Sequence, residues 1–294
     1  MRLVLAVVLT WTIPVLGQSQ SVPERTDDNL IVAAYNIQFL GERDHDLKKL
    51  AKVIQHFDVC GVVELKSETE LRELRAALEA TTNERWGYVF GVRTHRPQGN
   101  YHEAFGALWR RDRVELGDGV VGGLWDHAEE FRNDPFIVSF VRRGFDFSMI
   151  LLHTRWTNDP EGTRANEVAA IGRHSNWLRQ FLPERDILVA GDFNYPGTRA
   201  EMKALSQAAG LSQLDEDPKS TFSGDASHYV SSYDHIYANT FLTKEYVSGS
   251  CTTLDSTFVV YADNSPESMK LSKSELSDHL PVFAVFDVSK PDDD

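Results

Sequence analysis

The motif Gly191-Asp192-Phe193-Asn194 places a carboxylate and an amide two residues apart, directly after an apolar run that ends at Ala190. Side chains alternate along an extended chain, so Asp192 and Asn194 are expected on the same side, at the exposed end of a strand. A carboxylate beside a neutral amide suits the binding of a hard cation, or of an attacking oxygen near a phosphate. A plain turn after a strand would use the same residues, so the motif alone leaves both interpretations open.

Two histidines also lie at the ends of apolar runs. His153 follows residues 147–152, and His279 lies beside Asp278 just before the run that starts at Leu280. An imidazole with a pKa near 6.5 can take up and release protons at neutral pH, and Asp278 could orient it or bind a metal. A lone histidine at a strand end is more commonly a structural hydrogen-bonding group, so His153 alone does not indicate catalysis.

Asn36 and Glu64 have the same kind of position in the sequence. Asn36 follows the apolar residues 31–35, and Glu64 follows the apolar residues 59–63. The ends of strands from two packed sheets can meet at one rim, so all these polar side chains are expected to converge there.

The elements that must position these side chains can be predicted from hydrophobic periodicity. Short apolar runs predict strands over residues 31–35, 59–63, 88–92, 104–109, 136–141, 147–152, 187–190, 233–237 and 282–288. Helical spacing predicts helices over residues 47–57 and 164–181. Capping-box pairs, Ser67 with Glu70 and Thr198 with Glu201, predict two more, through residue 78 and up to Gly210. Many strands with few helices favour one α/β domain over residues 30–288, with two sheets packed face to face and helices outside.

The segment before this domain has the pattern of a secretory signal peptide over residues 1–17. A positive start at Arg2 is followed by an almost wholly apolar run over residues 3–16 and then by polar residues from Gln18. The run is too short to cross a bilayer of about 30 Å as a helix, although a buried strand or helix is an alternative. We therefore expect a secreted protein, extracellular or periplasmic, without a membrane span.

Composition restricts the possible functions further. The chain has 44 acidic and 30 basic side chains, a net charge of -14, and such a charge repels polyanions and excludes a histone-like or repressor-like DNA binder. An enzyme that holds phosphate locally through metal ions remains compatible, because a bound divalent cation reverses the local charge. Cys60 and Cys251 allow at most one disulfide, and the position of Cys60 inside an apolar run favours a buried free thiol.

Taken together, these residues resemble the endonuclease/exonuclease/phosphatase superfamily, and within it most closely the secreted DNase I-type nucleases. The resemblance covers about residues 30–288 and rests on ordered motifs: residues 31–42, Val63-Glu64, Tyr101-His102-Glu103, His153-Thr154, residues 191–194, residues 233–236 and residues 277–282. It implies a four-layer αββα sandwich of two mixed sheets with outer helices, and metal-dependent phosphoesterase activity.

The resemblance implies a metal site and a group that faces the phosphate. Asn36, Glu64 and Asp278 would surround Mg²⁺ or Mn²⁺, and Asp192 and Asn194 would position water or a second ion. Ca²⁺ is compatible with such proteins, but no set of residues here implies it.

The resemblance also implies acid–base groups on either side of the phosphate. His153 and His279 would be the general acid and base pair, with Glu103 orienting His153 and Asp234 orienting His279. Tyr101 would contact the groove of a DNA substrate.

Some positions differ from the family pattern. Val63 replaces a glutamine before the metal-binding glutamate, Lys66 replaces an arginine that enters the minor groove, and Arg132 is shifted by one residue from a phosphate-binding arginine. Arg155 and Trp156 follow His153 and offer a cation and a stacking surface for substrate, although Trp156 could equally pack beneath its loop. Lys66, Arg132 and Arg155 are therefore expected to bind substrate.

The predicted function is a secreted, metal-dependent, monomeric endonuclease that hydrolyses DNA, with RNA left open, at low sequence specificity. One alternative is a secreted phospholipid phosphodiesterase of the sphingomyelinase kind, which should carry an exposed aromatic hairpin. Another is a catalytically silent binding protein on the same scaffold, which would have no reason to keep both histidines and their carboxylates.

Overall fold

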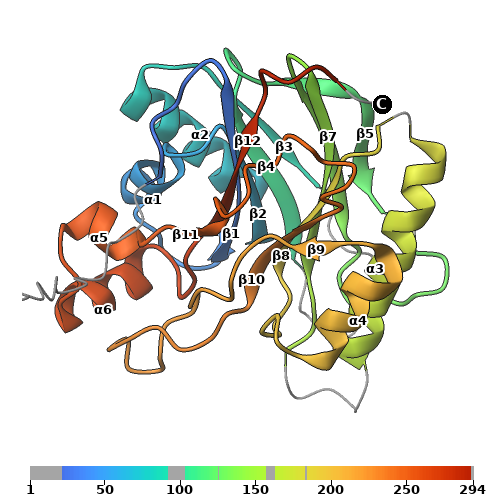
Figure 1. Cartoon of the computed structure of the whole chain (residues 1–294). Coiled ribbons are helices and arrows are strands. Elements are labelled where there is room, and N and C mark those ends of the chain that lie inside the picture. The colour runs from blue at the N-terminus through green and yellow to red at the C-terminus, as the bar shows by residue number, and fades with distance from the viewer. Residues whose placement is uncertain (1–21, 92–102, 125, 157–162, 183, 293–294) are drawn as a thin grey trace, which may run out of the picture.

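Two six-stranded mixed sheets form the centre of the molecule, in a computed structural model that describes residues 22–91, 103–124, 126–156, 163–182 and 184–292. In these ranges the first sheet has the strand order β11-β12-β1-β2-β4-β3 and the second β5-β6-β7-β8-β10-β9. Neighbouring strands are antiparallel except for β1 with β2 and β7 with β8. Helices cover the outer faces of both sheets (Figure 1), so the predicted four-layer αββα sandwich is confirmed.

The strands extend most of the predicted apolar runs by one to seven residues. The first sheet contains β1 (Asn29–Leu40), β2 (Val59–Leu65), β3 (Trp86–Phe90), β4 (Ala104–Arg110), β11 (Thr252–Thr253) and β12 (Val282–Asp287). The second contains β5 (Glu115–Gly123), β6 (Phe136–Arg142), β7 (Phe145–His153), β8 (Ile187–Asp192), β9 (Ser212–Gln213) and β10 (Asp234–Ala238).

Four of the six helices in the described residues begin at a side chain that caps the first turn. They are α1 (Leu47–Ile54), α2 (Glu68–Thr82), α3 (Thr163–Phe181), α4 (Ala200–Ala209), α5 (Ser256–Tyr261) and α6 (Pro266–Glu275). The Ser67 hydroxyl caps α2 as predicted, by accepting from the Thr69 N–H at 3.2 Å. The prediction of Thr198 as a cap was wrong: the N-cap of α4 is Arg199, which makes no side-chain capping bond. Over the described residues, no helix combines the length and hydrophobicity needed to cross a membrane.

Three apolar layers hold the sandwich together. One cluster lies between the two sheets and includes Met149 and Phe286, a second packs the first sheet against α1 and α2, and a third packs the second sheet against α3 and α4. Because the central strands are covered on both faces, their apolar runs are continuous and their polar residues are confined to the strand ends.

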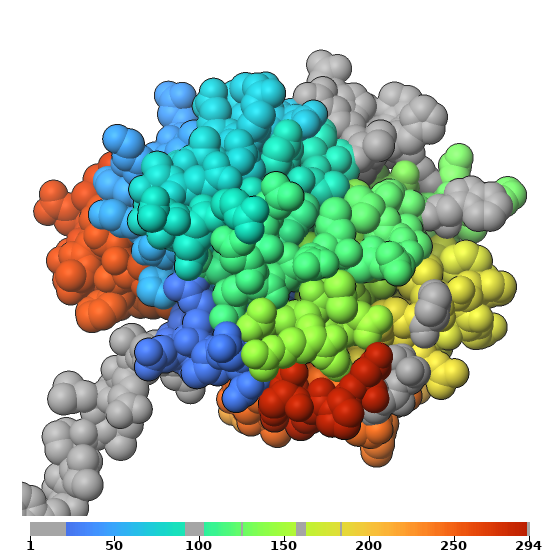
Figure 2. Space-filling model, turned by 90° about the horizontal axis from the view of Figure 1, so that it is seen from above, coloured from blue at the N-terminus to red at the C-terminus, as the bar shows by residue number. Residues whose placement is uncertain are grey.

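The start, middle and end of the described chain meet at one end of the sandwich, where Figure 2 shows them side by side. Arg143 forms an ion pair with Asp28 at 2.9 Å, and the Val288 N–H donates to the Asp28 carbonyl at 2.9 Å. This is the end at which β1 begins, so the opposite end, where β1, β2, β7 and β8 finish, is left for the polar motifs.

The two cysteines lie in different layers and are not bridged. Cys60 belongs to the cluster beneath α1 and α2, whereas Cys251 belongs to the cluster between the sheets. Burial raises the pKa of both thiols above its usual value, so neither is expected to react in the folded protein. We predict that a thiol reagent will titrate two thiols when the protein is unfolded without reductant. In the folded protein both thiols should react slowly. A count of zero in the unfolded protein would instead show a bridge.

Candidate active site

A cavity of about 410 Å³ opens at the end of the sandwich where β2, β7 and β8 finish. We call it the active-site cavity. Its polar lining includes Glu64, Asn133, His153, Asp192, Asn194, Asp278 and His279, and its other walls include Phe39, Arg132, Thr154, Arg155, Trp156, Phe222, Val230 and Tyr233. Most of the side chains that the sequence predicted for catalysis or metal binding are therefore brought to one place from both sheets.

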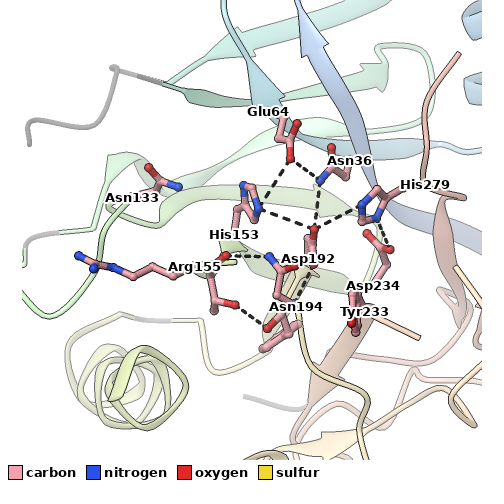
Figure 3. Close-up of polar contacts among 12 residues, drawn as sticks. Asn36, Glu64, Asn133, His153, Arg155, Asp192, Asn194, Tyr233, Asp234 and His279 are labelled. Atoms are coloured by element: carbon pink, nitrogen blue, oxygen red, sulfur yellow. Dashed lines mark hydrogen bonds and ion pairs between the residues drawn. The ribbon is translucent and has the colours of Figure 1, made fainter. Parts of the chain in front are cut away.

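Asp192 lies at the centre of this cavity, between the two imidazole rings (Figure 3). Its Oδ2 atom is 3.7 Å from Nε2 of His153 and 3.6 Å from Nε2 of His279, and it accepts a hydrogen bond from Asn36 Nδ2 at 3.1 Å. Strand pairing accounts for this arrangement, because His153 and Asp234 are the register partners of Asp192 on β7 and β10. One carboxylate thus contacts groups from both sheets.

Each histidine is held by a second carboxylate on the far side of its ring. Nδ1 of His153 is 2.8 and 3.0 Å from the two oxygens of Glu103, and Nδ1 of His279 is 2.7 Å from Asp234 Oδ2. Glu103 in turn accepts a hydrogen bond from Asn133. These contacts fix both rings so that Nε2 faces the cavity, in line with the predicted orienting roles of Glu103 and Asp234.

The charge of the two rings follows from these neighbours. Burial alone would lower the pKa of His153, but Glu103, Asp192 and Glu64 outweigh it and raise the pKa to about 10. Burial likewise opposes the charge on His279, and Asp234 with Asp192 still raises its pKa well above the usual value. Both imidazoles can therefore present an Nε2–H donor to an anion in the cavity.

One carboxylate oxygen of Glu64 has no hydrogen-bond partner among the described residues. Its Oε1 accepts from Asn36 Nδ2 at 2.9 Å, whereas Oε2 is buried without a hydrogen-bond partner, and burial raises the pKa of Glu64 to about 7. A buried, unpartnered carboxylate oxygen is unfavourable unless a positive group reaches it. Glu64 and Asp278 both line the cavity and thus supply oxygen atoms of the kind that bind a hard divalent cation.

Asn36 and Asn194 hold other groups of the site in place. Asn36 donates to both Glu64 and Asp192, while its Oδ1 accepts from the Gln38 N–H at 3.0 Å. Asn194 donates from Nδ2 to the Thr154 carbonyl at 2.8 Å, and its backbone N–H donates to Asp192 Oδ1 at 2.8 Å. Asp192 is thereby fixed from two sides.

The cationic residues predicted to bind substrate are placed unequally. Arg132 and Arg155 line the cavity, but the Arg155 side chain extends away from the histidines in Figure 3, and its Nε lies 3.6 Å from Glu167. Lys66 is outside the cavity lining, 3.7 Å from Glu42 and over the Phe39 ring. Tyr101 lies outside the described residues.

Asn133 and Glu167 support the site but were not predicted from the sequence. The buried Glu167 carboxylate on α3 accepts from the backbone N–H of Arg132 at 2.7 Å and from that of Arg155 at 2.8 Å. It therefore joins the two loops that carry Asn133 and Trp156 to the cavity. The sequence does contain a signal that Glu167 is buried, because it lies on the same helical face as the buried Ile171.

We predict that Glu167→Gln will lower both stability and activity. The amide of glutamine can accept only one of the two N–H bonds, so about 1–3 kcal/mol of unfolding free energy should be lost. Looser loops should also lower kcat/KM. Urea unfolding and steady-state kinetics would measure both effects, with Glu201→Gln on α4 as the control. An unchanged variant would contradict this role for the carboxylate.

The fold and the site together define a class of phosphoester hydrolase. Two sheets bring two imidazole–carboxylate pairs and a set of acidic oxygens to a single cavity, which is the chemistry needed at a phosphate. The chain belongs to the Endonuclease/Exonuclease/phosphatase family, whose profile matches residues 33–279.

Solved structures share this fold over most of the chain. A protein of the same family from Bacteroides thetaiotaomicron is 18% identical with a TM-score of 0.59, covering 90% of this chain and 98% of its own. A mannosyl-6-phosphatase from that bacterium is 17% identical (TM-score 0.55, 87% and 98% covered). The human nocturnin catalytic domain with bound sulfate is 14% identical (TM-score 0.55, 88% and 94% covered). A search of curated proteins finds no match.

Proposed function

We propose that this protein is a secreted, metal-dependent phosphodiesterase that hydrolyses nucleic acid, foremost DNA, at internal linkages with low sequence specificity. The observation that carries the proposal is the position of Asp192 between the two cavity-facing Nε2 atoms, each ring being held by its own carboxylate. The order of the sequence motifs, which resembles that of DNase I-type nucleases, supports nucleic acid as the substrate. Export would be directed by residues 1–17.

The side chains account for each proton in the hydrolysis. A water oxygen attacks phosphorus, and the carboxylate of Asp192, held by Asn36 and Asn194, orients that water and takes its proton. The phosphorus–oxygen bond to the leaving group breaks, and the leaving oxygen receives a proton from an imidazolium Nε2–H, supplied by His153 or His279. The other Nε2–H donates to a phosphate oxygen and stabilises its negative charge.

A divalent cation, which we propose to be Mg²⁺ or Mn²⁺, would be held by Glu64 and Asp278 with Asn36 beside them. When bound, such an ion neutralises charge that develops on the phosphate. The unpartnered Oε2 of Glu64 is the feature that supports this assignment.

The test is an assay of the purified protein on several phosphoesters. Supercoiled plasmid, linear duplex DNA, single-stranded DNA, RNA, sphingomyelin and a sugar 6-phosphate would each be incubated with Mg²⁺ or with EDTA. We expect cleavage of DNA only with the metal, and conversion of plasmid to open circles would show internal cleavage. Hydrolysis of sphingomyelin or of the monoester alone would overturn the proposed substrate while leaving the reaction class intact.

A further inference from the structure

One side of the active-site cavity is formed by aromatic rings rather than by cations. Trp156 is 54% exposed, and its ring meets that of Tyr233 edge to face, with centroids 5.7 Å apart and planes at 70°. We call this pair the aromatic wall. Phe222 and Val230 line the cavity beside it. The edge-to-face contact with Tyr233 holds the Trp156 ring, and about half of the side chain stays in solvent, so its open face is available to a ligand.

The residues of the aromatic wall lie close in sequence to the residues that hold or carry the imidazole groups. Tyr233 immediately precedes Asp234, the partner of His279, and Trp156 follows His153 by three residues. All these residues line or support the same cavity. A group joined to a phosphate between the two imidazoles would therefore reach the wall without a long linker.

An alternative is that cations bind several phosphates of a duplex. The described cations near the cavity are poorly arranged for this. Among the described residues the cavity lining contains two arginines, Arg132 and Arg155, and Arg155 lies beside Glu167. Lys66 lies near Glu42 and outside the lining. The chain as a whole carries a charge of -14. Duplex affinity depends on neutralising many phosphates, whereas stacking on an aromatic ring needs no charge.

From these observations we infer that the aromatic wall of Trp156 and Tyr233 stacks one unpaired base next to the scissile phosphate, so that single-stranded nucleic acid is the preferred substrate. In a duplex both faces of each base are covered by its neighbours, and a base can reach the indole only after it leaves the stack. A lipid chain would be served by a broader apolar surface than the aromatic wall with Phe222 and Val230, which polar groups such as Thr154 and Ser231 interrupt. This inference rests on the proposed function and adds the form of the substrate.

The test compares one labelled DNA strand in three forms: single-stranded, annealed to its complement, and single-stranded with a central stretch of abasic sites. For the full-length wild-type protein with Mg²⁺ we expect faster cleavage of the single strand than of the duplex, and weak cleavage inside the abasic stretch. Trp156→Ala should lower kcat/KM on the intact single strand by about tenfold or more, mainly by raising KM, because stacking contributes about 1–3 kcal/mol per base. The variant should cleave the abasic stretch and the flanking linkages at more nearly equal rates. Trp156→Phe should restore most of the loss.

Trp177→Ala provides the matched control. Trp177 is 47% exposed and packs against another ring, that of Phe181, with centroids 4.7 Å apart. It lies on α3 and does not line the cavity. We expect this variant to match the wild type on all three substrates. If Trp156→Ala also matches the wild type on the single strand, or if duplex is cleaved as fast as single strand, the inference is overturned while nuclease function stands. If the wild-type protein cleaves no nucleic acid but hydrolyses another phosphoester, the proposed function itself fails.

Discussion

Replacing His153 or His279 by alanine is expected to lower turnover of nucleic acid by on the order of 10² to 10⁴-fold, the usual contribution of a general acid or of a donor that stabilises developing charge. Each ring directs Nε2 at Asp192 and is held by a carboxylate through Nδ1, so loss of either ring leaves one Nε2–H of the pair for two roles. Steady-state kinetics at saturating substrate would measure the loss, with circular dichroism to verify folding. The double variant should fall well short of the product of the two losses, because the rings act on one phosphate.

His45→Ala is a suitable control for these variants. His45 is also partly buried, and burial lowers its pKa, but its Nδ1 contacts the Arg43 carbonyl and it lines a different cavity. Its replacement should leave turnover within a few-fold of the wild type. If one of the two active-site variants kept wild-type turnover, the role of that ring would be wrong.

The second large effect concerns the cation. We predict that EDTA abolishes activity, that Mg²⁺ or Mn²⁺ restores it, and that Glu64→Gln raises the Mg²⁺ concentration needed by on the order of 10- to 100-fold or more. Glutamine keeps an acceptor for Asn36 but removes the negative charge and the free Oε2, and hard cations favour charged oxygen ligands.

Thermal unfolding measures the same binding without turnover. A cation that binds only the folded protein raises the melting temperature, so Mg²⁺ should stabilise the wild type more than Glu64→Gln. Glu73→Gln, at an exposed position on α2, should behave like the wild type. Full turnover of the wild type in EDTA would refute the metal requirement.

The strand-end residues could be predicted from the sequence because burial on both faces of a central strand leaves polar side chains only where the strand ends. Asp192 and Glu64 each follow such a run, and the pairing of β8 with β7 and β10 then brings partners to Asp192. The two strand-end histidines were also identified in this way, but their carboxylate partners followed only from the family resemblance. A carboxylate 50 residues from His153 leaves no local pattern.

Other features had weak or conflicting local signals. β5 contains four glycines over Glu115–Gly123, a composition that disfavours a strand, and its edge position makes this tolerable. α6 was overlooked although Ser265 and Pro266 are typical of a helix start. Asn133 and the loop-joining role of Glu167 depend on contacts between segments that are at least 12 residues apart, and only the assembled fold reveals them.

The backbone at Glu64 has a consequence for the stability of the whole protein. Glu64 has a φ of 61°, and the pairing of β2 with β4 is interrupted between Val62 and Leu65, so the chain bulges where this carboxylate enters the cavity. A left-handed conformation at a residue other than glycine is unfavourable by roughly 1–2 kcal/mol. Glu64→Gly should therefore be more stable to urea than Glu64→Ala by about 1 kcal/mol, although both would be inactive; the reverse order would show that the bulge is relaxed. The backbone at this position favours glycine, but only a carboxylate can bind the cation, so the site keeps an unfavourable backbone conformation for the sake of catalysis.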